Sequence, residues 1–209
     1  MKLSIESIHL GAVVVLANEC FNDERGLFME TYRADHFREL GLPTDFAQDN
    51  LSRSSKHVLR GLHFQWDPPI GKLMRVAQGR AFLVAVDIRK DSPTLGQSFG
   101  IDVSADDRKQ VWAPAGFARG FCALSDWVEI QYKCTGTYNR LTEGGIRWND
   151  PALGIDWPIS NPILSYKDEH APTLAEWLAS KESANFLVSP PGVTETRQAD
   201  LSRPKVETA

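Results

Sequence analysis

The chain has 209 residues, of which 42% are hydrophobic and 24% are charged, a composition typical of a globular protein with a single core. Its formal net charge of −4 argues against a nucleic-acid partner, because a protein that follows phosphates normally has an excess of Lys and Arg. The first ten residues lack the apolar run of a signal peptide, and no stretch approaches the roughly 20 apolar residues of a membrane span. We therefore expect neither a nucleic-acid nor a membrane partner.

The cysteines and histidines argue against a metal site. Cys20, Cys122 and Cys134 are an odd number and form no C-x-x-C pair, which favours free thiols in a reducing, cytoplasmic location. The five histidines include no H-x-H pair, so a metal site would need scattered ligands. A glycine-rich dinucleotide fingerprint is also absent from the sequence. We expect no metal and no cofactor.

Strand patterns dominate the chain from its beginning. Short apolar or alternating segments, rich in β-branched and aromatic residues, occur at 12–17, 72–78, 80–89, 97–103 and 127–135. Helical patterns occur only at 34–40, which precedes Gly41, and at 173–181. Many short strands with almost no helix between them predict an all-β sandwich or barrel.

The predicted domain covers residues 1–182. From about Ser183 the chain contains Ser189-Pro190-Pro191-Gly192 and then mostly polar residues. This composition is typical of a C-terminal extension, flexible or lying on the surface as an arm, at 183–209.

The densest cluster of polar residues lies between Phe46 and Lys72. Strand alternation places Gln48 and Asn50 on one face and Asp49 on the other.

A potential base lies in the apolar segment 58–64. Strict alternation puts Arg60 and His63 on opposite faces, and Gly61 between them is a position where a bulge would redirect one side chain. With a reference pKa of about 6.5, a neutral imidazole at His63 suits a general base. A hydrogen-bonded core histidine is the alternative.

Two further polar side chains are expected to face the interior. Tyr132 shares an apolar strand face with Val128 and Ile130, so it is either a proton donor or a tyrosine with one backbone hydrogen bond. Lys72 alternates with Met74, and a buried lysine is costly unless it meets an anion. Lys72 is therefore a candidate for function.

Arginines outside these strands have less specific settings. Arg25 and Glu30 belong to a charged turn that enters a strand, for which a solvated loop is the default. Arg119 lies between small residues in the tightly packed segment 112–121, where it would bind an anion or form a salt bridge.

Nine longer motifs carry a family resemblance. In chain order they are FNDERGLFMETY, FAQDNLS, VLRGLHFQ, KLMRV, DIRKDSPTLG, WAPAGFARGF, EIQYKCTGTYN, GIRWNDPALGIDWP and LSYKD. From about Phe21 to Trp177 the chain resembles the dTDP-4-dehydrorhamnose 3,5-epimerase family. The resemblance implies a cupin-type jelly roll, usually a homodimer with exchanged strands, and a nucleotide-diphosphate sugar as substrate.

The resemblance also implies catalytic roles. His63 would be the base, and Asp168 would orient it and balance its charge. Tyr132 would be the acid on the opposite face of the sugar ring, and Lys72 would stabilise an enolate oxygen at C4. Arg60 would lie beside the sugar and the phosphates. The residues expected to hold the nucleotide and pyrophosphate are Arg25, Glu30, Gln48, Asn50, Glu143 and Lys167, with Tyr138 stacked on the base.

The implied reaction is inversion of C3 and C5 of dTDP-4-keto-6-deoxyglucose in rhamnose or related deoxysugar synthesis. A proton next to a ketone can be removed once a nearby cation stabilises the negative charge on the oxygen. Removal on one ring face and return on the other inverts the carbon. The reaction needs no redox step and no metal.

Two departures from the family pattern are visible. The family usually has His where this chain has Arg119, at a position expected near the phosphates, where Arg would serve as an anion ligand. The loop 65–72 is one residue shorter than usual and lacks the family's glutamine before the lysine. Either change would suit another nucleotide, another sugar or inversion at one carbon only.

Three other functions compete with the 3,5-epimerase. They are a 3- or 5-epimerase for another nucleotide-linked 4-keto sugar, a non-catalytic sugar-nucleotide-binding cupin, and a metal-dependent cupin enzyme. Binding alone does not need both an acid and a base, so the presence of both His63 and Tyr132 argues against the binding protein.

Overall fold

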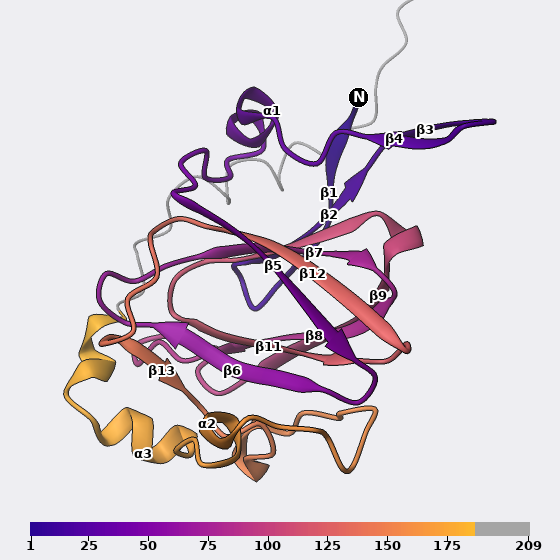
Figure 1. Ribbon diagram of the computed structural model, residues 1–209. Coiled ribbons are helices and arrows are strands. Elements are labelled where there is room, and N and C mark those ends of the chain that lie inside the picture. The colour runs from indigo at the N-terminus through magenta and orange to yellow at the C-terminus, as the bar shows by residue number, and fades with distance from the viewer. Residues whose placement is uncertain (187–209) are drawn as a thin grey trace, which may run out of the picture.

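Two antiparallel sheets lie face to face in the computed structural model, which describes residues 1–186 (Figure 1). The six-stranded sheet has the order β1 (Leu3–His9), β2 (Val13–Asn18), β10 (Lys109–Ala113), β7 (Lys72–Gln78), β12 (Trp127–Cys134) and β5 (Gln48–Ser55). The five-stranded sheet has the order β13 (Glu143–Gly145), β6 (Leu59–Gln65), β11 (Phe117–Ala123), β8 (Arg80–Asp87) and β9 (Ser98–Ser104). The all-β prediction is confirmed, and the five predicted strands correspond to β2, β7, β8, β9 and β12.

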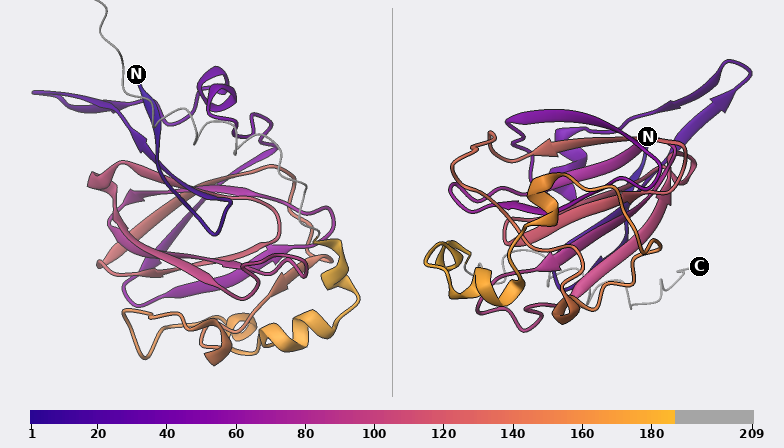
Figure 2. Two further views of the ribbon diagram at one scale, coloured as in Figure 1. Left: turned by 180° about the vertical axis from the view of Figure 1, so that it is seen from behind. Right: turned by 60° about the horizontal axis from the view of Figure 1, so that its bottom comes forward.

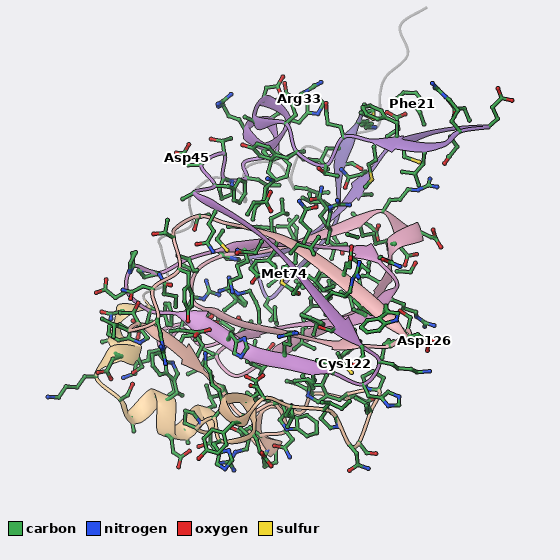
Figure 3. All side chains as sticks on the ribbon, viewed as in Figure 1. Phe21, Arg33, Asp45, Met74, Cys122 and Asp126 are labelled. Carbon is green, nitrogen blue, oxygen red and sulfur yellow. The ribbon has the colours of Figure 1, made fainter. Side chains whose placement is uncertain are left out.

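The main core fills the space between the sheets. Residues alternate along each strand, so every second side chain points inward, as Val128 and Ile130 do on β12. Met74 on β7 lies in this interlayer space, at the centre of the molecule (Figure 3). Its neighbours include Leu83 and Phe121 from the opposite sheet.

Three short helices cover the outside of the sandwich. They are α1 (Ala34–Glu39), α2 (Tyr166–Glu169) and α3 (Leu174–Ala179). Helix α1 places Phe37 on an apolar cluster on the outer face of the six-stranded sheet, whereas α2 and α3 lie beneath the five-stranded sheet (Figures 1 and 2). Both predicted helices are present as α1 and α3, each slightly shorter than expected.

The described chain packs on the sandwich as far as its last residue. Phe186 is buried, with its ring 5.7 Å from that of Phe64 and 6.1 Å from that of Trp177. The first residues of the predicted extension, including the 3₁₀ turn Glu182–Asn185, therefore continue the fold. Residues 187–209 of that extension lie outside the described residues.

A two-stranded hairpin projects away from both sheets. It consists of β3 (Cys20–Asp23) and β4 (Gly26–Met29), and two views show it extending beyond the body (Figures 1 and 2). Phe21, Leu27 and Phe28 on this hairpin are 59%, 56% and 68% exposed. Such a concentration of exposed large apolar side chains is typical of an interaction surface.

None of the helices among residues 1–186 has the length and apolar character needed to span a bilayer.

Candidate active site

Three of the four predicted catalytic residues, His63, Lys72 and Tyr132, line one cavity. This cavity has a volume of about 180 Å³. Its lining comes from both sheets and comprises Ser52, Arg60, His63, Lys72, Met74, Arg119, Gly120, Phe121 and Tyr132. A second hollow of about 250 Å³ shares Arg60 and His63 with it and extends to Lys167 and Asp168. The two spaces together form a site that runs from the interior to the outside.

An irregularity in β6 turns both of its polar side chains toward this cavity. On β11, Arg119 pairs with His63 and Phe121 pairs with Arg60, so β6 contains one residue more than β11 between the two pairs. At Gly61 the backbone has φ +144°, and a Cβ there would lie 2.6 Å from the Cα of Gly120. Glycine is therefore needed for this close approach. A register irregularity is thus present where the sequence offered a position for a bulge, and it overrides strict alternation.

The base is held by a buried carboxylate. His63 Nε2 lies 2.5 Å from Asp168 Oδ1, and the Asp168 side chain is only 4% exposed. Burial opposes ionisation of Asp168, but the hydrogen bond and the charge of His63 outweigh it and lower the pKa of this carboxyl below its usual value. An ionised Asp168 accepts the Nε2–H, which leaves the lone pair on Nδ1 of His63 free to take a proton.

Tyr132 and Lys72 face His63 from the opposite wall. They lie on neighbouring strands of the six-stranded sheet, with Lys72 Nζ 5.1 Å from the centre of the Tyr132 ring. Burial, together with the nearby Cys134, raises the pKa of Tyr132, so its hydroxyl keeps its proton near neutral pH. Burial first, and then the charge of Arg119, lower the pKa of Lys72 to about 8. A proton donor and an ammonium group thus stand across the cavity from the base.

Positive charge gathers here without neutralising partners. Among residues 1–186, no carboxylate forms an ion pair with Arg60, Lys72 or Arg119, although each lines the cavity. Arg60 instead donates through Nε to Ser54 Oγ at 3.0 Å. Cations left unpaired in a partly buried site favour an anionic ligand.

The residues predicted to hold the nucleotide form a connected row along one edge. Gln48 donates through Nε2 to Asn50 Oδ1 at 2.8 Å and accepts from the Tyr138 backbone N–H at 2.7 Å. The Tyr138 hydroxyl donates to Glu143 Oε2 at 2.9 Å, and Lys167 Nζ lies 2.6 Å from the same oxygen. Burial opposes ionisation of Glu143, but the hydrogen bonds from Lys167 and Tyr138 bring its pKa below the usual value.

Two predicted ligands are not brought to the cavity by their own chain. Arg25 lies in the turn of the projecting hairpin, is 87% exposed, and pairs with Asp23 at 2.5 Å. Glu30 follows β4, and its carboxylate lies 3.5 Å from His36 and 3.7 Å from Arg33. Their expected contact with the substrate stays a prediction.

Arg119 lies in the interior of the protein, away from solvent. Its side chain is almost fully buried, and the guanidinium donates to the carbonyls of Ile70 and Ala113, at 3.2 Å in each case. Its Nε has no hydrogen-bond partner. The hydrogen bonds of Arg119 go to backbone carbonyls and not to a carboxylate, and its expected contact with an anion stays a prediction.

Sequence reasoning missed two contributors. Ser165 caps α2, and its Oγ accepts from the Asp168 backbone N–H at 3.2 Å, which fixes the turn that carries the Asp168 carboxylate. A Ser followed three residues later by Asp is a recognisable helix-start pattern, so this signal was available. The buried thiol of Cys134 receives a contact from Asn50 Nδ2 at 3.7 Å, and no sequence pattern indicates it.

The residues that the structure describes include no group of three or more His, Cys, Asp or Glu placed to hold a metal ion.

A β-sandwich cavity with a base on one wall and an acid and an ammonium on the other defines a class of protein, an isomerase that moves protons next to a carbonyl group. The chain belongs to the dTDP-4-dehydrorhamnose 3,5-epimerase family, whose model matches residues 7–176. It is thus an epimerase.

Relatives and solved structures agree with this assignment. The chain is 51% identical over 172 residues to the dTDP-4-dehydrorhamnose 3,5-epimerase of Salmonella typhimurium, which covers 81% of this chain and 94% of that relative. It is 42% identical over 156 residues to a dTDP-4-dehydrorhamnose 3-epimerase of Streptomyces niveus, with coverage of 74% and 75%. A Legionella pneumophila 3,5-epimerase in complex with dTDP-4-keto-L-rhamnose superposes with a TM-score of 0.83, at 42% identity and coverage of 87% and 97%. The cupin-type jelly roll predicted from the sequence is thereby confirmed.

Proposed function

We propose that this chain inverts C3 and C5 of dTDP-4-keto-6-deoxyglucose in the synthesis of a deoxysugar such as rhamnose. One observation carries the proposal: the paired His63 and Asp168 lie on the wall of the cavity opposite Tyr132. A non-catalytic binding protein has no need of this arrangement.

The reaction begins with removal of the C3 proton by His63. The electron pair of the C–H bond moves into the ring, and negative charge develops on the C4 oxygen, where the Lys72 ammonium stabilises it. Tyr132 then gives its proton to the opposite face of C3, so the carbon is inverted. His63 and Tyr132 return to their starting states by exchanging protons with water. C5 flanks the same C4 carbonyl, so the same groups serve the second inversion.

The nucleotide half of the substrate would lie along the outer edge of the site. Arg60 and Lys167 line the outer hollow and are placed for phosphate oxygens. Tyr138 is 54% exposed, so its ring offers a surface on which a base can stack. The Legionella structure that contains a dTDP-linked sugar supports a ligand of this kind.

We further propose that the working unit is a homodimer. Arg25 and the apolar side chains of the hairpin are exposed on their own chain, and a second copy would provide a surface that covers them. In that arrangement the hairpin of one chain brings Arg25, and Glu30 behind it, to the nucleotide edge of its partner. The cytoplasmic location is likewise an inference from the free thiols of Cys20, Cys122 and Cys134.

The test of the reaction is deuterium incorporation from heavy water into dTDP-4-keto-6-deoxyglucose, followed by NMR at C3 and C5. Label at both carbons, with inversion, supports the proposal. Label at one carbon shows a single-centre epimerase, the activity in the name of the Streptomyces niveus relative. No label at either carbon contradicts the proposed substrate. The His63→Ala variant is the control, and it should incorporate no label.

A further inference from the structure

Arg119 is a buried cation whose hydrogen bonds all go to backbone carbonyls. Two of its nitrogens, Nη1 and Nη2, donate to the Ile70 carbonyl at 3.2 Å, and Nη1 also reaches the Ala113 carbonyl at 3.2 Å. Its Nε is buried without a partner, and no carboxylate among residues 1–186 pairs with it. A charge held in this way costs folding free energy unless it serves the site.

The two carbonyls that Arg119 holds both belong to the surroundings of Lys72. Ile70 precedes Lys72 by two residues, and Ala113 is the register partner of Lys72 on β10. The intervening Gly71 is fixed from the other side, since its N–H donates to Thr135 Oγ1 at 2.9 Å. Arg119 therefore joins the end of the shortened loop to the strand beside it, at the point where β7 begins.

Space behind this segment is filled. A Cβ on Gly71 would lie 2.2 Å from the Trp112 ring, so the peptide cannot retreat in that direction. With the Trp112 ring against Gly71 and the guanidinium bound to the Ile70 carbonyl, the backbone that leads to Lys72 has little freedom. The unusual arginine and the unusual loop thus act on the same peptide.

The charge of Arg119 also acts on Lys72 directly, after burial the second cause of its lowered pKa. Several other groups face or influence the Lys72 ammonium. They are Tyr132 and Cys134 on β12, His63 and Arg60 on β6, Glu143 on β13 and Lys167 on α2. Of these, Lys167 is paired with Glu143 and His63 with Asp168. Arg119 and Arg60 have no ion-pair partner among residues 1–186, and Arg119 is the cation whose charge lowers the pKa of Lys72 most. Burial lowers the pKa of Arg119 only to about 10, so it remains charged at neutral pH.

We propose that Arg119 is a positioning residue: its guanidinium fixes the peptide that leads into Lys72 and places a second positive charge beside the Lys72 ammonium at neutral pH. This inference rests on the proposed function for its catalytic meaning. In the reaction, the enolate oxygen would supply the anion that Arg119 and Lys72 lack in the resting site. A histidine at this position would lose most of its charge above a pH of about 6.5, whereas an arginine keeps it.

The test measures the pH at which the Lys72 amine titrates, with no substrate present. The purified protein is labelled with a trace of acetic anhydride from pH 6 to pH 11, and the extent of labelling at Lys72 is read by mass spectrometry. The parent should show a midpoint near 8. Arg119→Gln should move the midpoint toward the ordinary value of 10.5 and reduce labelling at pH 8 by about fivefold. Arg119→Lys keeps the charge and should stay within about twofold of the parent.

An unchanged midpoint in Arg119→Gln would overturn the proposal, because a purely structural arginine has no effect on the titration of Lys72. If that variant does not fold, Arg119→His provides the same comparison, since its imidazole is neutral at pH 8. Because no substrate is present, a failure here is distinct from a failure of the epimerase proposal.

A second measurement tests whether the fork, meaning the Arg119 nitrogens Nη1 and Nη2 that bind the Ile70 and Ala113 carbonyls, positions Lys72. In the exchange reaction, both Arg119→Gln and Arg119→Lys should lose about tenfold or more in kcat with little change in KM, since neither has the rigid planar guanidinium whose two nitrogens fix the Ile70 carbonyl while one of them reaches Ala113. Parent-like kcat in Arg119→Lys would show that the fork does not position Lys72 and would overturn that half of the proposal.

Discussion

At the scale of single residues, the site divides one proton transfer between two groups of opposite character. In the proposed mechanism, ionised Asp168 prepares His63 to accept a proton, and burial keeps the proton on Tyr132 until it is transferred. Because the two groups lie on different sheets, they approach a ring between them from opposite sides. Inversion follows from this separation rather than from the strength of either group.

Removing the Tyr132 hydroxyl should therefore separate exchange from inversion. In Tyr132→Phe, His63 can still remove a proton and return it to the same face. We expect deuterium to enter at least one carbon while the yield of inverted sugar falls by about 10²-fold or more, in the range of a lost general acid. NMR of the product in heavy water measures both quantities. Tyr166→Phe is the matched control, since Tyr166 is 78% exposed, and an unaltered epimer yield in Tyr132→Phe would exclude it as the acid.

The Lys72 ammonium should lower the free energy of unfolding, because it is buried. Its pKa falls from 10.5 to about 8 on folding, so the protonated form is disfavoured in the folded state. At pH 7 this amounts to about 3 kcal/mol, and we expect Lys72→Met to recover about 2–3 kcal/mol while its turnover falls by about 10² to 10³.

The sign of the pH dependence follows from the same values. Between about pH 8 and 10.5 the folded chain has released the Lys72 proton and the unfolded chain has not, so the stability of the parent rises with pH. The gain in Lys72→Met should therefore shrink across this window and lose its electrostatic part above it. Denaturant unfolding at pH 7 and pH 10 measures this. Lys109→Met, in which an ion pair with Glu6 is lost instead, should not gain stability. Equal gains at both pH values would contradict the charge argument.

At the scale of elements, one strand decides where the base lies. The extra residue in β6 brings Arg60 and His63 to the same side, and the contact of Gly61 with Gly120 makes room for it. A regular β6 would direct one of these side chains away from the cavity.

Gly61→Ala should accordingly damage both stability and activity. The added Cβ would lie 2.6 Å from a backbone atom, so β6 or β11 must move. We expect a loss of about 2 kcal/mol or more in unfolding free energy and a fall of at least about tenfold in exchange rate. Gly11→Ala is the control, because Gly11 also has positive φ but open space around it, and only a backbone cost of about 1 kcal/mol is expected. Full activity in Gly61→Ala would show that the strands can separate without moving His63.

The elements also show what could be read from the sequence. The alternation predicts inward-facing side chains for Lys72 and Tyr132, and both line the cavity, because the pairing of β7 with β12 is in regular register from Lys72 to Val76; alternation depends only on neighbouring residues. The contact of His63 with Asp168 spans 105 residues, and the resemblance supplied it where local patterns could not. The carbonyl partners of Arg119 were not predictable, because backbone carbonyls carry no sequence signal. The exposed hairpin was read as a charged turn, since Asp23, Glu24 and Arg25 dominate its sequence and hide the apolar residues beside them.

At the scale of the whole molecule, each active site in the proposed homodimer is built from two chains. A chain with Arg25→Ala keeps its own His63, and a chain with His63→Ala keeps its own Arg25. In a mixed dimer, one site would receive both defects and the other neither.

We expect each variant to be inactive alone, and mixing the two should therefore restore activity. After joint refolding we expect about a quarter of the parent rate, because about half of the dimers are mixed and one site in each is intact. The exchange assay on the mixture, with each variant alone as control, measures this. Continued inactivity of the mixture, with dimers confirmed by light scattering, would show that Arg25 does not act in its partner's site.

In the proposed homodimer, the projecting hairpin makes activity depend on protein concentration. A chain alone carries its base, acid and ammonium but not the whole nucleotide edge, so dilution below the dissociation constant of the dimer would lower the activity of every chain without unfolding any of them. In that dilute range the rate would rise with the square of the protein concentration, as for any reaction whose catalyst must first be assembled from two equal halves.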